Sequence, residues 1–201
     1  MAVSLYSIGY ATKPIEEFIA QLQQHKIAAV ADVRSVPFSK AFFDYHQDAI
    51  RETLKKAGIY YVYLGDELGP RSKDPRHYDE SGQVQFDRLQ ASALFLDGIA
   101  RLDNGIAKGM RIALMCAEKD PAVCHRSLLI GHYWLRKRSD VPLMHICHDG
   151  ALESQAALEA RITEMHSTGQ DLFMTACECA SQAFAQQLKA KAYRKPDMPN
   201  S

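Results

Sequence analysis

The stretch Ile27-Ala-Ala-Val-Ala-Asp-Val33 indicates the fold class of this chain. It is an almost uninterrupted apolar run, which is typical of a strand that is covered on both faces of a parallel sheet. Comparable runs lie at residues 3–8, 59–64, 111–116 and 142–147. Longer segments with helical periodicity separate these runs, so strands alternate with helices along the chain. That alternation predicts an α/β fold.

The connecting segments place apolar residues at helical spacing. The longest of them, residues 86–104, is expected to form one helix with Leu89, Leu96 and Ile99 buried. A last amphipathic pattern begins near residue 171 and is expected to pack as a helix on the same domain.

The size of the chain agrees with a single domain. Its 201 residues, 47% of them hydrophobic, suffice for one packed core. We predict one three-layer, Rossmann-like α/β domain over residues 1–188, in which helices flank a mostly parallel sheet of about five strands. Residues 189–201 are expected to form a flexible tail.

The amino-acid composition argues against several classes of protein. The 24 Lys and Arg residues balance 24 Asp and Glu residues, so no net charge favours nucleic acid or a membrane surface as the partner. No apolar run approaches the ~18 residues that a membrane helix needs. The odd number of cysteines, 5, argues against a disulfide framework and favours a reducing compartment. The chain is therefore expected to be a cytoplasmic protein with free thiols.

Polar side chains follow the predicted strands at the points where the strands end. Because ligands of open α/β sheets bind at the carboxyl ends of the strands, these side chains form the predicted site. Several of them are cationic, which favours a small anionic ligand. The candidates are Ser7, Tyr10, Asp32, Arg34, Ser35, Ser39, Cys116, Glu118, Cys124, His125 and Arg126.

The triplet Cys124-His125-Arg126 is the most informative part of this set. A thiol in the opening turn of a helix, beside His and Arg, has a lowered pKa and is a better nucleophile. An alternative is that Cys124 only packs in the core, with Arg126 paired to Glu118 and His125 bound to the backbone.

A second thiol, Cys116, ends a predicted strand, where a small apolar residue also fits. With Cys124 it makes a redox pair conceivable, or half of a zinc site with His125 or His148. The close pairing of two cysteines that is typical of zinc sites is absent, so we predict no metal and leave the cofactor unassigned.

The Asp32-Val33-Arg34 step has two interpretations. Arg34 binds an anion and Asp32 orients an arginine, or the two form an ion pair that braces two loops.

Some familiar catalytic arrangements are excluded. A Cys-x5-Arg phosphate cradle needs arginine at positions that hold Ala122, Ile130 and Glu153. No Gly-x-Gly-x-x-Gly follows the first strand, and no Gly-Lys-Ser or Gly-Lys-Thr occurs, so standard dinucleotide and nucleoside-triphosphate loops are missing.

Over roughly residues 5–146 the chain resembles a family of prokaryotic proteins, the domain of unknown function 488. The resemblance implies a compact α/β domain with a polar site, in a family without an established activity. Tyr10 stands where such proteins often have histidine, and Pro70 where a second glycine is common, so no histidine role is carried over to position 10. The matching motifs are Ser7-Ile8-Gly9-Tyr10, Asp32-Val33-Arg34-Ser35 with Pro37 and Ser39, Tyr61 through Leu68-Gly69, Leu114-Met115-Cys116-Ala117-Glu118, Cys124-His125-Arg126 and His145-Ile146.

The leading hypothesis is an intracellular enzyme that acts on a small phosphorylated or nucleotide-like molecule. Arg34 and Arg126 are assigned to anion binding and Cys124 to nucleophilic attack. His125 or Glu118 is assigned to proton transfer.

Two other hypotheses remain. A non-catalytic module could bind nucleotide or nucleic acid through residues 71–77 and the basic segment 189–195. A thiol redox or metal protein could use Cys116 and Cys124.

Overall fold

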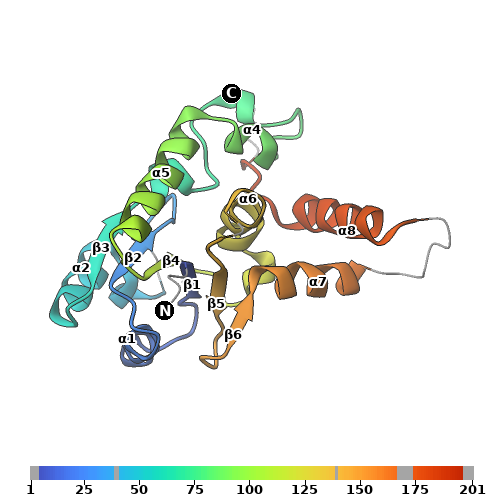
Figure 1. Ribbon diagram of the computed structural model, residues 1–201. Coiled ribbons are helices and arrows are strands. Elements are labelled where there is room, and N and C mark those ends of the chain that lie inside the picture. The colour runs from blue at the N-terminus through green and yellow to red at the C-terminus, as the bar shows by residue number, and fades with distance from the viewer. Residues whose placement is uncertain (1–4, 39–40, 139, 167–173, 197–201) are drawn as a thin grey trace.

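A computed structural model describes residues 5–38, 41–138, 140–166 and 174–196. Six strands form one sheet in the order β3-β2-β4-β1-β5-β6 (Figure 1). Strands β1 to β5 are parallel, and β6 pairs antiparallel with β5. The α/β prediction is confirmed, and β6 is an addition that the sequence did not suggest. The strands are β1 Leu5–Gly9, β2 Ala29–Asp32, β3 Tyr60–Tyr63, β4 Ile112–Cys116, β5 Leu143–Ile146 and β6 Leu152–Ser154.

Helices connect and cover these strands. A π-helical segment, Arg126–Gly131, leads directly into α6. Short helical turns lie at Phe43–Tyr45, Pro75–His77 and Pro121–Val123. The α-helices are α1 Ile15–Gln24, α2 Gln47–Lys56, α3 Gly65–Leu68, α4 Phe86–Gln90, α5 Ala93–Ala107, α6 His132–Lys137, α7 Gln155–His166 and α8 Ala176–Lys191.

The long helix expected over residues 86–104 is in fact two helices, α4 and α5. Ser92 ends the first and caps the second, because its Oγ accepts the backbone N–H of Phe95 at 3.2 Å. Leu89 and Ile99 are buried as expected. The expectation for Leu96 was wrong, since it is 42% exposed. The break at Ser92 rotates the apolar stripe, so Leu96 faces solvent.

Side chains of each central strand alternate between two apolar clusters, one on each face of the sheet. In β4, Ile112, Leu114 and Cys116 join one cluster, and Ala113 and Met115 join the other. Helices α1 and α2 cover the second cluster, and α5, α6 and α7 cover the first. The sheet is therefore the middle of three layers, as predicted.

Helices α7 and α8 lie side by side and project from the sheet (Figure 1). Phe184 of α8 is buried and its ring stacks on His132 at a centroid distance of 3.8 Å. The apolar spacing Phe173, Cys177, Ala180, Phe184 and Leu188 predicts the buried side of this helix, but Cys177 is exposed and Phe173 lies outside the described residues. The last helix thus packs on the domain through its second half.

The chain stays folded beyond residue 189, where the sequence predicts a tail. Helix α8 continues to Lys191, and the Tyr193 carbonyl accepts the Val84 N–H at 2.9 Å. The Lys195 N–H donates to the Gly82 carbonyl at 2.9 Å. No helix in the described part of the chain is long and apolar enough to cross a membrane.

Candidate functional site

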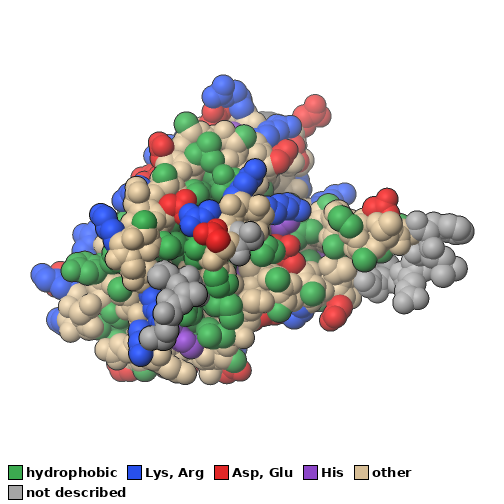
Figure 2. Space-filling model, in the orientation of Figure 1, with side chains coloured by type: hydrophobic (Ala, Val, Ile, Leu, Met, Phe, Trp, Pro, Cys, Tyr) green, Lys and Arg blue, Asp and Glu red, His purple; other side chains and the backbone are tan. Residues whose placement is uncertain are grey.

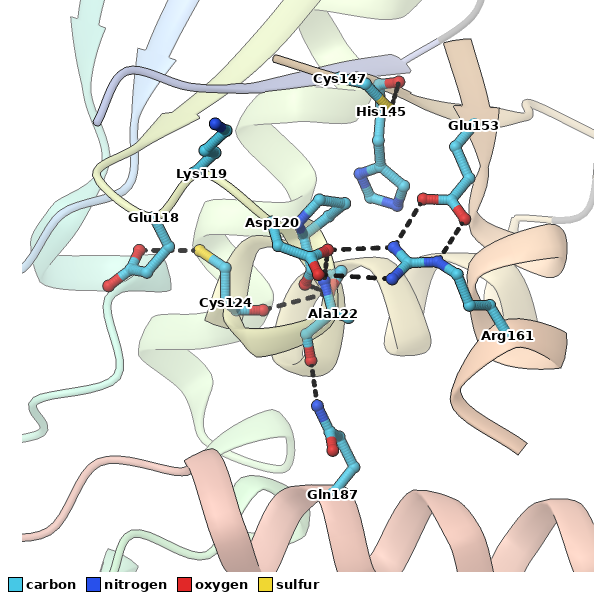
Figure 3. Close-up of polar contacts among 12 residues, drawn as sticks. Glu118, Lys119, Asp120, Ala122, Cys124, His145, Cys147, Glu153, Arg161 and Gln187 are labelled. Atoms are coloured by element: carbon cyan, nitrogen blue, oxygen red, sulfur yellow. Dashed lines mark hydrogen bonds and ion pairs between the residues drawn. The ribbon is translucent and has the colours of Figure 1, made fainter. Parts of the chain in front are cut away.

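The loop after β4 brings four reactive side chains together at the carboxyl edge of the sheet. Cys116, Glu118, Cys124 and His125 each offer one atom to a cluster in which all four atoms lie within 4.8 Å of one another. Oε2 of Glu118 lies 2.9 Å from Cys116 Sγ and 3.0 Å from Cys124 Sγ. Figure 3 shows the Glu118 carboxylate turned towards the Cys124 sulfur. The sequence predicted all four residues as members of one site, and the fold assembles them.

The turn Pro121–Val123 returns the chain from Glu118 to Cys124, and three contacts fix it (Figure 3). The Asp120 carboxylate accepts the Ala122 N–H at 2.9 Å, which caps the turn. Arg161 of α7 donates to Asp120 at 3.0 Å, and Gln187 of α8 donates to the Ala122 carbonyl at 2.5 Å. Both C-terminal helices therefore support the loop that carries the cluster.

The orientation of His125 determines which of its nitrogens faces the thiols. Its Nε2 lies 2.8 Å from the Val33 carbonyl, which can only accept, so Nε2 carries a proton. The other nitrogen, Nδ1, lies 3.6 Å from Cys116 Sγ and 4.0 Å from Cys124 Sγ. Nδ1 is therefore free to accept a thiol proton or to bind another electrophile.

The two thiols differ in acidity. Burial alone raises the pKa of Cys124, but the hydrogen bond from Cys116 and the positive charges of Arg126 and His125 outweigh it and hold that pKa well below its usual value. Burial raises the pKa of Cys116 well above the usual value. Burial lowers the pKa of His125, yet the contact with Cys124 raises it on balance. Both shifts favour transfer of the Cys124 proton towards His125.

Solvent reaches the cluster from one side. Cys116 and Cys124 are 3% and 1% exposed, whereas Glu118 is an exposed residue. The Glu118 carboxylate contacts both sulfurs. Burial raises the pKa of this carboxyl above its ordinary value, which makes it a better proton acceptor. A molecule that binds Cys124 Sγ on the side of Glu118 would displace this carboxylate.

Arg126 binds the backbone of the loop after β4 from the interior of the protein. It is fully buried, and its two terminal nitrogens donate to the carbonyls of Glu118 at 2.5 Å and Lys119 at 3.2 Å. Its Nε has no partner among the described residues. The sequence predicted an anion-binding guanidinium here or a partner for Glu118. The structure places Arg126 on the Glu118 backbone, not on its carboxylate.

Asp32 and Arg34 form a buried ion pair with 2.6 Å between Oδ2 and Nη2. The second terminal nitrogen of Arg34 donates to the Tyr10 hydroxyl at 3.1 Å and to the Tyr45 carbonyl at 2.7 Å. The Tyr61 hydroxyl donates to the same Asp32 oxygen at 2.7 Å. These contacts correspond to the brace that was one of the two interpretations of this step, and Tyr10 belongs to it.

The structure reveals a buried polar chain that the sequence analysis missed. Ser7 was expected near a ligand, but its hydroxyl is buried and lies 2.6 Å from His145 Nδ1. His145 Nε2 lies 2.8 Å from Gln155 Oε1, and burial lowers the pKa of His145 to about 4. A histidine inside an apolar strand was the available signal for this chain of contacts.

The remaining predicted residue after β2, Ser35, accepts the Arg71 N–H at 3.0 Å. Ser39 lies outside the described residues. Ser35 lines a surface hollow of about 950 Å³ that also includes Arg71, Lys73 and Arg76. The hollow does not include the thiols, and it is lined by carboxylates as well as by cations.

The two basic segments of the alternative binding hypothesis meet in the structure. The Arg71 guanidinium lies 4.9 Å from the Tyr193 ring centre, and Lys195 Nζ lies 3.8 Å from the ring centre of Tyr78. On the face shown in Figure 2, however, cationic and anionic side chains are interspersed. The meeting of the two segments does not create a patch of one sign on that face.

Comparison with known proteins identifies one relationship. The family model described as "Domain of unknown function DUF488" matches residues 14–133, which is more than half of the 201 residues. A search of curated proteins finds no match. The matched region includes the Asp32–Arg34 pair and the four residues of the thiol cluster. The chain therefore belongs to the DUF488 family.

Proposed function

We propose that the protein is an enzyme that acts on a small anionic, phosphorylated or nucleotide-like molecule, with Cys124 as its nucleophile. The observation that supports this most directly is the surroundings of Cys124 Sγ, which has the Glu118 carboxylate at 3.0 Å and His125 Nδ1 at 4.0 Å. The Val33 carbonyl orients His125 in turn. A nucleophile with a base that a third group orients is the usual arrangement for covalent catalysis.

The roles of the residues follow from these contacts. The Cys124 thiol proton passes to Glu118 or His125, and Sγ forms a bond to the electrophilic atom of the substrate. The leaving group departs with the bonding electron pair and takes up the proton that Glu118 or His125 holds. Glu118 must swing away from Cys116 and Cys124 to admit the substrate, and it remains close enough to exchange protons.

An anionic substrate agrees with the charges around the loop. Arg126 donates only to carbonyl oxygens in its described contacts, so its positive charge stays in place beneath the loop. The neighbouring Lys119 is exposed on the loop surface. The charge of Arg34, by contrast, is balanced by Asp32. We therefore propose Arg126 and Lys119 as the sources of attraction for the anion.

The free thiols also support a location. All five cysteines are unpaired, and a catalytic thiolate persists in a reducing compartment. We propose the cytoplasm as the place where the enzyme acts.

Alkylation of the native protein tests the nucleophile. We expect Cys124 to react with iodoacetate about tenfold or more faster than half-buried Cys147, measured for each cysteine by mass spectrometry. The ratio of iodoacetate to iodoacetamide rates at Cys124 should exceed that of a free thiol, because the first reagent is an anion.

The outcome that overturns the proposal is an inert Cys124 in both the native protein and Glu118→Ala. The alanine variant removes the cover over the thiols, so poor access no longer explains a lack of reaction.

A second candidate function is a nucleic-acid-binding module, favoured by the contact between residues 71–77 and 189–195. Binding through phosphate contacts should weaken steeply with salt. We expect Arg71→Ala and Lys195→Ala to reduce that salt slope if this candidate is correct, as measured by fluorescence anisotropy with single-stranded DNA.

A further inference from the structure

We propose that Cys116, Glu118, Cys124 and His125 form a binding site for a zinc ion. The four side chains supply two sulfur atoms, one carboxylate oxygen and one imidazole nitrogen, all within 4.8 Å of one another. Zinc takes these ligand types in a tetrahedral arrangement, whereas magnesium and calcium prefer oxygen alone. The sequence argued against a metal because Cys116 and Cys124 are not closely spaced along the chain, but the turn Pro121–Val123 brings them together.

The spacing of the ligand atoms is close to what a zinc ion needs. Tetrahedral bonds of ~2.0–2.3 Å place neighbouring ligand atoms about 3.3–3.8 Å apart. His125 Nδ1 lies 3.6 and 4.0 Å from the two sulfurs, and Glu118 Oε2 lies 2.9 and 3.0 Å from them. The Glu118 oxygen must therefore move away from the two sulfurs, and Glu118 is an exposed residue.

The surroundings hold His125 in the form that a metal requires. Its Nε2–H is bound to the Val33 carbonyl at 2.8 Å, which leaves Nδ1 directed at the two sulfurs. A zinc ion that binds there displaces any proton that Nδ1 holds. Metal-binding histidines in proteins usually have their second nitrogen fixed in this way. The contact with Val33 therefore selects the tautomer that coordinates zinc.

The charge of a zinc complex also suits the interior. Two thiolates and one carboxylate carry three negative charges, so the complex with Zn²⁺ carries one negative charge. The fully buried Arg126 lies directly behind it, on the carbonyls of Glu118 and Lys119. Each thiol releases its proton to solvent when it binds the metal. Arg126 then balances the remaining charge of the centre.

Zinc and the reaction proposed above compete for the same sulfur. This consequence rests on the proposed function, since it takes Cys124 as the nucleophile. With zinc bound, Cys124 Sγ shares its negative charge with the metal and is held beside the other ligands, so it is a weaker nucleophile and the metal-bound protein is the less reactive form. Metal binding and nucleophilic reactivity are therefore two alternative states of one site.

Metal analysis of the full-length protein tests the site. Protein freed of metal by a chelator is titrated with Zn²⁺, and separately with Co²⁺, whose bonds to two thiolates give a charge-transfer absorption band. We expect about one ion per chain. Cys116→Ser and Cys124→Ser should each weaken binding by at least about tenfold, and Glu118→Gln should weaken it less. Cys147→Ser, which alters a half-buried thiol outside the cluster, is the matched control and should bind normally.

The proposal is overturned if the wild-type protein binds no zinc at near-stoichiometric level. It is also overturned if the Cys116→Ser/Cys124→Ser double variant retains the ion, or if only Cys177→Ser/Cys179→Ser loses it. Thermal unfolding shows whether each variant is folded.

The alkylation experiment separates this proposal from the proposed function. Zinc should protect Cys124 but not Cys147 from iodoacetate. If metal-free Cys124 is inert while zinc binds, the nucleophile is wrong and the metal site stands. If Cys124 reacts but no zinc binds, the metal site is wrong and the nucleophile stands.

Discussion

At the scale of single residues, the molecule contains the same ion pair in two environments. The pairs are Asp32 with Arg34 and Asp74 with Arg76, and one residue separates the two members of each pair. In both pairs Oδ2 lies 2.6 Å from Nη2. In both, the carboxylate also accepts the backbone N–H of the arginine. The first pair is buried, whereas Arg76 is exposed to solvent. Because the geometry is the same, a comparison of the two pairs shows how burial alone changes the contribution of such an ion pair to stability.

We predict that Asp32→Asn lowers the free energy of unfolding by about 3–5 kcal/mol, because it leaves the buried Arg34 charge without its partner. Asp74→Asn is the matched control, and we expect a much smaller change because solvent screens that pair. Urea unfolding measures both. Equal losses in the two variants would contradict the prediction.

His145 makes stability depend on pH. The folded chain takes up this proton only near pH 4, whereas a free histidine does so near pH 6.5. The unfolded state therefore binds more protons between these values, so stability falls as pH is lowered from about 6.5 to 4. At ~1.4 kcal/mol per pKa unit the loss is about 3 kcal/mol.

The measurement is the difference in unfolding free energy between the wild type and His145→Gln across that pH range. Other titrating groups cancel in this difference. We expect the wild type to lose stability relative to the variant as the pH falls, and a constant difference would show that His145 does not titrate there.

The residue types predict the members of the thiol cluster, but they do not predict the hydrogen-bond partner of each polar side chain. Cys116, Glu118, Cys124 and His125 were predictable because Cys116 ends one strand and the other three follow it, and the carboxyl end of a strand confines the loop attached to it. The sequence shows that Arg126 and Ser7 can donate hydrogen bonds, but it does not show which groups accept them. Their acceptors lie on the loop after β4 and on β5, and only packing determines them.

At the scale of elements, β1 must approach the loop after β4 very closely. A methyl group at Gly9 would overlap the Glu118 carbonyl and press on the Arg126 guanidinium. Glycine at the end of β1 is thus what allows Arg126 to reach that carbonyl.

We predict that Gly9→Ala displaces the Glu118 loop and lowers both the thermal stability and the alkylation rate of Cys124. Gly105→Ala, in α5, is the control, because its methyl group meets only the end of the Ile112 side chain. An unchanged Cys124 rate in a destabilised Gly9→Ala variant would show that the loop holds its position without this contact.

The strands were predictable because burial on both faces requires continuous apolar runs. Strand β6 lacks such a run, since Leu152–Ser154 is a short edge strand with a single apolar residue. The division between α4 and α5 was missed because Ser92 interrupts the backbone pattern but not the apolar spacing. A short edge strand and a cap between two helices depend on contacts with neighbouring elements, and the apolar periodicity of the sequence does not describe these contacts.

At the scale of the whole molecule, the C-terminal helices join the sheet to the thiol cluster. The Phe184 ring packs on His132, and Gln187 of the same helix reaches the Ala122 carbonyl beside Cys124. Loss of the packing at α8 should therefore affect the cluster as well as the stability.

We predict that Phe184→Ala lowers the free energy of unfolding by about 2–4 kcal/mol and changes the alkylation rate of Cys124. Met165→Ala in α7 removes an exposed side chain and should change neither quantity. Chemical unfolding and mass spectrometry supply the two measurements. A stability loss with an unaltered Cys124 rate would show that α8 does not support the loop.

The position of β1 in the middle of the sheet also determines when this strand can pair during synthesis on the ribosome. Leu5 of β1 pairs with Ile112 of β4 and with Leu143 of β5, so β1 has no strand partner until β4 has been synthesised. At roughly 5–20 residues per second, this apolar strand waits on the order of ten seconds. Nascent chains that stop before residue 112 expose it, and should be the ones that chaperones retain.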